Sequence, residues 1–291
     1  MRYAAIDVGS NAVRLLIADI IENNGSISFK KNTLIRVPVR LGDDAFLNKH
    51  ISDKKATDLI KSMQAFRNLM DVYKVSAYMA CATSAMREAL NGQEVVARIK
   101  DEADINLEII HGEKEAKIIY ASHAEINIDK GKNYLYIDVG GGSTELSLFS
   151  DEELVASQSF NLGTIRILDN QDKEETWNEM RDFIRENTRS HKNIWGIGTG
   201  GNINKLYRLS KEKDNAPLSY AKLKDLYNYL SSFSLKDRIN VLGLNQDRAD
   251  VIIPACEIYL TVLKSANIKH IYVPTVGMVD GIIQTLIEKN Y

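Results

Sequence analysis

The sequence predicts an α/β protein built of two lobes, each a β-sheet covered by helices. A length of 291 residues corresponds to about two domains. A strand-like segment with a glycine turn occurs twice, and strand-like and helix-like stretches alternate after each copy. With 44% hydrophobic and 26% charged residues, the composition is that of an ordinary protein with a packed core. Disordered and fibrous architectures are therefore excluded.

The repeat consists of residues 3–15 and 134–146. In both copies a β-rich run ends in an aspartate, a glycine-containing turn follows, and a second apolar run leaves the turn. The two aspartates, Asp7 and Asp138, lie 131 residues apart, and the neighbouring Tyr, Ile, Val and Gly coincide at the same offset. This pattern predicts strand, tight turn and strand. Duplication of one hairpin explains it better than chance.

Further elements follow each hairpin. Residues 27–39 and 154–160 are β-like, and apolar residues at three- and four-residue spacings predict an amphipathic helix over 53–73, with Ser52 or Asp53 as its N-cap. Other strands are expected at 76–82, 107–110, 194–197 and 270–273, and other helices at 94–100, 113–123, 203–209, 223–230, 247–263 and 278–288. The polar stretch 127–133 is the expected joint, which gives lobes of 1–125 and 126–291, and 211–217 is an expected loop.

The net charge and the cysteine content limit the classes of binding partner and the cellular compartment that we expect. The sequence has 37 Lys and Arg and 39 Asp and Glu, which gives a net charge of -2. This charge is too balanced for a protein whose surface covers a nucleic-acid duplex, but it does not exclude local basic pockets. Cys81 and Cys256 stand alone among apolar neighbours, which indicates reduced core thiols. No apolar run approaches the length of a membrane span. We expect a cytoplasmic protein with no membrane partner.

The two repeated glycine turns have the residue types expected of a phosphate-binding site. Glycine lets backbone N–H groups approach an anion, and a nearby carboxylate can hold Mg²⁺ or its water shell. The alternative is that Asp7 and Asp138 only cap turns. Duplication and the three consecutive glycines of the second turn favour phosphate. The candidate phosphate-binding residues of the turns are Ser10, Asn11, Gly140, Gly141, Gly142, Ser143 and Thr144.

A third glycine segment, residues 196–202, lies between a predicted strand and a predicted helix. It matches neither the dinucleotide fingerprint nor a Walker loop. A helix N-terminus beside open amides suits an anion or a nucleoside, so Gly200, Gly201 and Lys205 are further phosphate-binding candidates. Scattered Arg and Lys usually face solvent, but Arg14, Arg40, Arg87 and Lys205 are candidates for binding phosphate oxygens.

Together these residues carry a family resemblance. The two hairpins and the late glycine segment resemble the superfamily of acetate and sugar kinases, heat-shock chaperone ATPases and actin. Within it the chain resembles the exopolyphosphatase and guanosine pentaphosphate phosphatase family, in its short two-domain form, over nearly its whole length. The matching segments are 6–14, 39–42, 82–91, 112–116, 138–145, 162–166 and 248–252. The resemblance implies two ribonuclease-H-like (actin-like ATPase) lobes, an active-site cleft between them, and pairing into a homodimer.

The resemblance also implies roles. Glu115 would activate or orient the attacking water and Glu145 would work beside it, with Mg²⁺ held by Asp7, Asp138 and Glu145. Phosphoanhydride hydrolysis needs these parts: an in-line water, a group that orients it, and cations on the phosphate oxygens. From its position alone, Glu115 is also an ordinary first-turn helix charge.

The expected function is therefore metal-assisted release of terminal orthophosphate from polyphosphate, from the 5′ end of guanosine pentaphosphate, or from both. Two alternatives remain. One is a small-molecule kinase or ATPase of the same superfamily, and the other is a non-catalytic sensor of guanosine tetraphosphate or polyphosphate.

Overall fold

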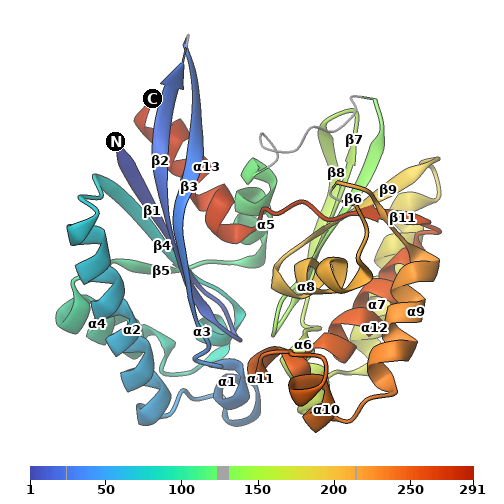
Figure 1. The fold of residues 1–291 in the computed structure, drawn as a ribbon, viewed down its shortest axis with the longest axis horizontal. Coiled ribbons are helices and arrows are strands. Elements are labelled where there is room, and N and C mark those ends of the chain that lie inside the picture. Colours follow the sequence, from blue (N-terminus) through green and yellow to red (C-terminus); the bar gives the residue numbers. More distant parts are fainter. Residues whose placement is uncertain (24, 123–130, 214) are drawn as a thin grey trace. The chain divides into compact units, whose positions relative to one another are not determined.

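The computed structural model describes residues 1–23, 25–122, 131–213 and 215–291. The chain forms two compact units, Met1–Glu125 with Val276–Tyr291, and Ile126–Thr275. The predicted second lobe, 126–291, is therefore too long at its C-terminal end. Helix α13 (Met278–Asn290) belongs to the first unit, because its apolar residues share a core with strand β1 (Arg2–Val8) and helix α5 (Gly112–Ala121) (Figure 1).

The first unit contains a five-stranded sheet in the order β3-β2-β1-β4-β5. Its first three strands, β1 (Arg2–Val8), β2 (Val13–Asn23) and β3 (Ser26–Val37), form an antiparallel meander. Strand β4 (Ala77–Ala82) runs parallel to β1, and β5 (Leu107–Ile109) runs parallel to β4.

Helices cover both faces of this sheet. The longer ones, α2 (Asp53–Val72) and α4 (Gly92–Ala103), lie on one face, whereas α5 (Gly112–Ala121) and α13 lie on the other (Figure 1). Ser52 caps α2, as predicted, by accepting a hydrogen bond from Lys55 N. Two short helices, α1 (Gly42–Asn48) and α3 (Ser84–Glu88), come from connections in which we predicted no helix.

The second unit contains a six-stranded sheet in the order β10-β11-β9-β6-β7-β8. Here β6, β7 and β8 are antiparallel neighbours, β9 is parallel to β6, and β11 is parallel to β9. The strands are β6 (Asn133–Val139), β7 (Thr144–Ser150), β8 (Glu153–Phe160), β9 (Ile194–Thr199), β10 (Leu218–Ser219) and β11 (His270–Tyr272).

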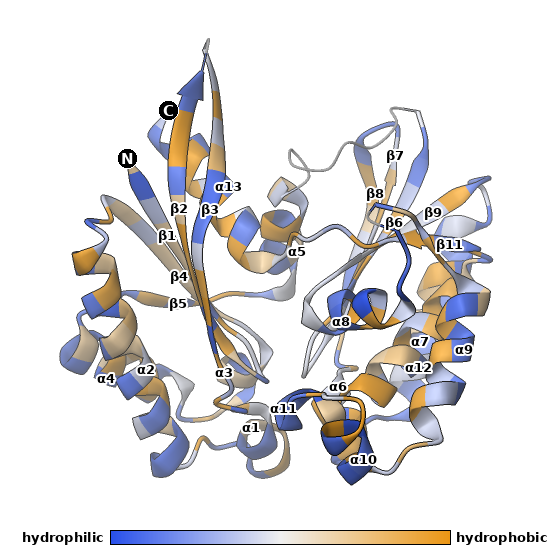
Figure 2. Ribbon diagram, in the orientation of Figure 1, coloured by the Kyte–Doolittle hydropathy of each residue, from blue (hydrophilic) through white to orange (hydrophobic). Residues whose placement is uncertain are grey.

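The core of the second unit lies between this sheet and its helices. The mostly hydrophobic helix α12 contributes the buried Tyr259, Val262 and Leu263 (Figure 2). The helices are α6 (Thr164–Leu168), α7 (Glu174–Thr188), α8 (Gly201–Ser210), α9 (Tyr220–Ser231), α10 (Leu235–Asn240), α11 (Gln246–Ala249) and α12 (Ile252–Ser265). No helix in the described ranges is both long and apolar enough to cross a membrane.

The two sheets confirm the predicted fold class and the duplication. A meander of three strands is followed by parallel strands on the far side of the first strand in each unit. The register repeats as well, since Asp7 pairs with Arg14 and Asp138 pairs with Glu145.

Two other predictions about elements have different outcomes. The helix predicted over 247–263 is two helices, because Pro254 lacks an N–H and fits only within the first turn of α12. The predicted joint, 127–133, lies mostly outside the described residues.

Candidate active site

The glycine hairpin of the second unit has an unusual hydrogen-bond pattern. Gly140 N donates to Ser143 O at 2.9 Å and closes the turn. The carbonyl oxygens of Gly140, Gly141 and Gly142 accept from Thr164 N, Ile165 N and Arg166 Nε, at 3.1, 2.8 and 2.6 Å. The segment that begins α6 therefore holds every carbonyl of the glycine run.

The amides of this hairpin remain available. Across the described ranges, no group accepts a hydrogen bond from the N–H of Gly141, Gly142 or Ser143. Gly163 makes the close approach possible, since a Cβ there would lie 2.4 Å from Gly141 O. A turn with fixed carbonyls and available amides is an anion-binding cradle.

The first hairpin is built in the same way. Gly9 N donates to Ala12 O at 3.2 Å, and the carbonyls of Ser10 and Asn11 accept from Gly42 N and Arg40 N at 2.9 and 3.0 Å. The hydroxyl of Ser10 also lies 2.8 Å from that of Ser84, the first residue of α3. The hairpin is thus fixed to two neighbouring segments of its own unit.

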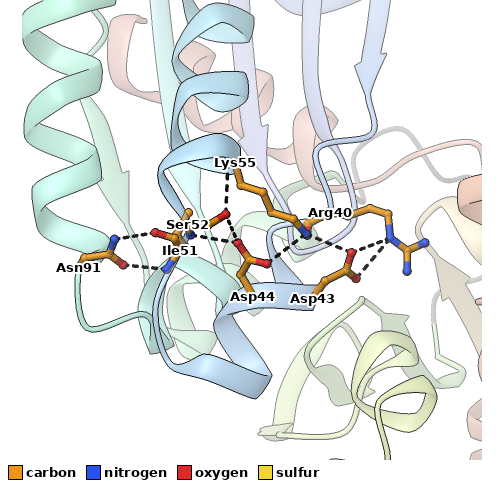
Figure 3. A network of polar contacts seen from close by, with 7 residues as sticks. All are labelled: Arg40, Asp43, Asp44, Ile51, Ser52, Lys55 and Asn91. Carbon is orange, nitrogen blue, oxygen red and sulfur yellow. Dashed lines mark hydrogen bonds and ion pairs between the residues drawn. The ribbon is translucent and has the colours of Figure 1, made fainter.

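A polar network fixes the segment that anchors this hairpin (Figure 3). Lys55 Nζ contacts the carbonyl oxygen of Arg40 and lies 3.0 Å from Asp43 Oδ2. Arg40 has a left-handed φ of 55°, and its Nε lies 3.1 Å from the same Asp43 oxygen. The candidate Arg40 is therefore positioned by an acidic partner.

Glu115 lies in the first turn of α5, yet it is only 8% exposed. Its neighbour Glu113, in the same turn, is exposed, so a favourable interaction with the helix dipole does not require burial. Arg87 Nη1 lies 3.7 Å from Glu115 Oε2 and donates to Ile110 O at 2.8 Å. Burial beside a guanidinium favours a functional role for Glu115 over that of an ordinary first-turn charge.

Asp7 already has a cation as its partner. Its Oδ2 lies 2.5 Å from Arg14 Nη1. Burial raises the pKa of the Asp7 carboxyl, and Arg14 acts in the opposite direction. The guanidinium already balances the charge of Asp7, which weakens this carboxylate as a metal-binding candidate.

The second unit places a row of polar side chains across its sheet. The residues are Thr199, Asp138, Glu145 and Ser159, which are register partners on β9, β6, β7 and β8. Glu145 is buried and accepts from Ser159 Oγ at 2.8 Å. Paired residues share a face, so Asp138 and Glu145 present their carboxylates on the same side.

The late glycine segment approaches this row. Gly200 has φ +93°, and a Cβ there would lie 2.6 Å from Asp138 Oδ1, so glycine is required on both counts. Gly201 begins α8, which also carries the half-buried Lys205, and Gly201 O accepts from Arg248 Nη1 at 2.8 Å.

Thr144, a predicted phosphate-binding residue, and Gly198, in the late glycine segment, make structural contacts. The Thr144 side chain is fully buried and its Oγ1 donates to Leu162 O at 2.6 Å, which indicates a structural hydroxyl. Gly198 makes room for Ile271, whose Cδ1 would lie 2.8 Å from a Cβ there. Our candidate residues omitted Ser84, Ser159 and Arg248. The first and last stand within matching segments, whereas nothing in the sequence distinguishes Ser159 from other serines of β8.

A ready-made metal site is absent from the described part of the chain, where no three His, Cys, Asp or Glu side chains cluster suitably. Mg²⁺ is commonly held by one or two carboxylates, with waters and phosphate oxygens completing its shell. Asp138 and Glu145 fit that requirement because they lie on one face of neighbouring strands.

The duplicated hairpins, the buried Glu115 and the paired carboxylates define a phosphate-handling α/β protein. The family comparison gives the same class. The model of the Ppx/GppA phosphatase family matches residues 20–290, so the chain belongs to this family. Its expected class, a phosphate-releasing hydrolase, is confirmed at that level.

The curated relatives of this chain include enzymes with different named activities. A bifunctional 3-dehydroquinate synthase/phosphatase of Fusobacterium nucleatum is 29% identical over 86% of this chain, which spans 41% of that protein. A putative exopolyphosphatase of Haemophilus influenzae is 24% identical, with coverage of 99% and 92%. A guanosine-5′-triphosphate,3′-diphosphate pyrophosphatase of Aeromonas salmonicida is 24% identical, with coverage of 99% and 60%.

Solved structures share the fold. The crystal structure of an exopolyphosphatase from Cytophaga hutchinsonii has a TM-score of 0.86 at 24% identity, covering 99% of this chain and 98% of that one. A Ppx/GppA family member from Aquifex aeolicus has a TM-score of 0.77 at 25% identity, with coverage of 100% and 99%.

Proposed function

We propose that this protein hydrolyses terminal phosphoanhydride bonds, releasing orthophosphate from inorganic polyphosphate, from the 5′ end of guanosine pentaphosphate, or from both. The observation that carries the proposal is the second hairpin, whose carbonyls are all held by the start of α6 while three consecutive amides are available to an anion. The family and the names of the relatives support the same substrates.

Glu115 is proposed to orient the attacking water and accept its proton. Hydrolysis of a phosphoanhydride depends mainly on positioning this water and stabilising charge on the transferred group. A buried carboxylate is suited to the task because few bulk waters compete for it. Arg87, 3.7 Å away, holds Glu115 and provides a guanidinium for phosphate oxygens.

Mg²⁺ is the proposed cofactor, with Asp138 and Glu145 as the residues that would hold it. When bound, it neutralises charge on the phosphate oxygens. Ser159 orients Glu145 by donating to its Oε1, while Gly200 keeps the space beside Asp138 free of a side chain. Asp7, already paired with Arg14, is proposed to position that arginine for phosphate.

Incubation of the purified protein with polyphosphate, guanosine pentaphosphate and ATP, each with Mg²⁺, tests the proposal. We expect orthophosphate from at least one of the first two substrates. Phosphorylation of an acceptor by ATP, without orthophosphate from the other substrates, would identify a kinase. Binding without any turnover would identify a sensor.

Two further properties are proposals from the family resemblance and the cysteines. Cys81 and Cys256 are free and buried, which is compatible with a reducing cytoplasm. Pairing into a homodimer is the expected assembly, and sedimentation analysis of the purified protein tests it.

A further inference from the structure

Thr199 has a buried hydroxyl that the fold does not use. The residue ends β9 and is 1% exposed. Its Oγ1 has no hydrogen-bond partner among the described residues, whereas its carbonyl oxygen accepts from Tyr259 Oη at 2.9 Å. A buried polar group without a partner destabilises a fold, so such a group calls for a physical explanation.

The position of Thr199 supplies that explanation. Thr199 is the register partner of Asp138, so both side chains lie on the face that also carries Glu145. The opposite face of β9 packs into the core, where Gly198 adjoins Ile271 and Ile203. The hydroxyl therefore belongs to the polar row and not to the hydrophobic core.

The backbone beside Thr199 favours an anion. Gly200 follows it in a left-handed conformation, and Gly201 begins α8, a helix of 10 residues. The first amides of a helix carry partial positive charge and attract phosphate. Threonine is stiff about χ1, so its hydroxyl is held in place before any ligand arrives.

We infer that Thr199 is a ligand-binding residue whose Oγ1 donates a hydrogen bond to a phosphate oxygen of the substrate or product. The inference rests on the proposed function and adds to it a residue outside our sequence-based candidates. No bond is made or broken by Thr199, which binds and orients the phosphoryl group beside Asp138.

Thr199→Val provides a sharp test because valine has nearly the shape of threonine without its hydroxyl. Calorimetry with inorganic phosphate and excess Mg²⁺ should show a Kd about 10- to 100-fold higher than that of the wild-type protein, as expected for losing a hydrogen bond to a charged group. Thr199→Ser, which restores the hydroxyl, should bind within about threefold of wild type.

Stability separates a ligand-binding hydroxyl from a structural one. Without phosphate, Thr199→Val should have a Tm equal to or above that of the wild type, because it removes a buried hydroxyl without a partner. The contrast is Thr144→Val, whose lost hydroxyl leaves the buried carbonyl of Leu162 without its donor and should lower the Tm by several degrees.

A Thr199→Val protein with wild-type phosphate affinity, or with a Tm lowered to that of Thr144→Val, would overturn the inference. If the wild-type protein itself neither binds phosphate nor releases it from polyphosphate or guanosine pentaphosphate, the proposed function fails. An active wild type whose Kd is unchanged by Thr199→Val refutes the role of Thr199 alone.

Discussion

The side chains of Arg87 on α3 and Glu115 on α5 contact each other within the first unit, with Arg87 Nη1 3.7 Å from Glu115 Oε2. The same nitrogen donates to Ile110 O, just before α5, and so connects α3 with the start of the helix that carries Glu115. Ser84, at the other end of α3, lies beside Ser10 of the first hairpin. The short helix α3 thus connects the phosphate hairpin to the proposed general base.

Glu115→Gln is expected to lower kcat by about 10²–10⁴. Glutamine keeps the shape of the side chain but removes its charge and basicity, so the water is no longer deprotonated. Affinity for polyphosphate should be retained or increased, because a negative charge near a polyanion is lost. Steady-state kinetics of phosphate release measure both quantities.

Glu113→Gln is the matched control for this variant. It makes the same charge change in the same first turn of α5, but at an exposed side chain. Its kcat should stay within about twofold of wild type, since an exposed first-turn charge affects only the helix dipole. Equal losses in the two variants would show that Glu115 acts through helix charge and not through chemistry.

Mg²⁺ is expected to bind tightly only together with phosphate. Asp138 and Glu145 offer two carboxylates, and the described residues hold no larger acidic cluster, so substrate oxygens must complete the shell. Calorimetric titration of Mg²⁺ should give weak heats for the free protein and clear binding after phosphate is added. Asp138→Asn should raise the Mg²⁺ concentration needed for half-maximal activity, and tight stoichiometric binding to the free protein would contradict this model.

The hairpins were predictable because their signal is local. An aspartate, a glycine turn and alternating apolar residues determine strand, turn and register together, and the copies reinforce each other. The contact between Arg87 and Glu115 joins residues 28 positions apart, and no periodicity indicates it. Thr144 shows the same limit, because the turn motif gives its position but not that its hydroxyl donates to Leu162 O.

The placement of α13 was not predictable for a related reason. Its apolar spacing predicts an amphipathic helix but does not say which sheet the helix covers. Sequence proximity favoured the second lobe, yet Met278, Ile282 and Ile283 share the core of the first unit with Tyr3 and Ala5. Apolar side chains pack without directional bonds, so the choice of partner depends on the whole surface.

Asp280 should make the free energy of unfolding increase as the pH falls towards 3.8. Burial raises the pKa of this α13 carboxyl above its ordinary value of 3.8, and Lys31 Nζ, 2.6 Å from Oδ1, opposes the shift. The folded state then binds a proton more tightly than the unfolded state. Lowering the pH through the raised pKa towards 3.8 should therefore stabilise the wild type relative to Asp280→Asn.

Denaturant unfolding between pH 7 and pH 4 measures this difference, and a second series below pH 4 measures the contrast with Asp19. Asp19 is the matched contrast, because hydrogen bonds from Asn32 and Arg2 lower its pKa. The stabilisation from Asp19 is present above 3.8 and is lost as the pH falls through its lowered pKa, so Asp19→Asn should show the opposite slope in more acidic solution. A pH-independent difference between wild type and Asp280→Asn would contradict the burial of a titrating carboxyl.

Gly281→Ala should impair both stability and turnover. A Cβ at this position of α13 would lie 1.8 Å from Ile118 O of α5, so the two helix backbones must separate. The overpacking penalty should lie towards the upper end of about 1–3 kcal/mol, which exceeds the helix-propensity gain of roughly 1 kcal/mol. Because Ile118 lies one turn after Glu115, kcat should fall as well.

Gly277→Ala is the control, since Gly277 has extended backbone and no atom within 4 Å of an added Cβ. Unfolding midpoints and kcat of both variants test the argument, and a Gly281→Ala protein as stable and active as Gly277→Ala would show that α13 does not position the helix of Glu115.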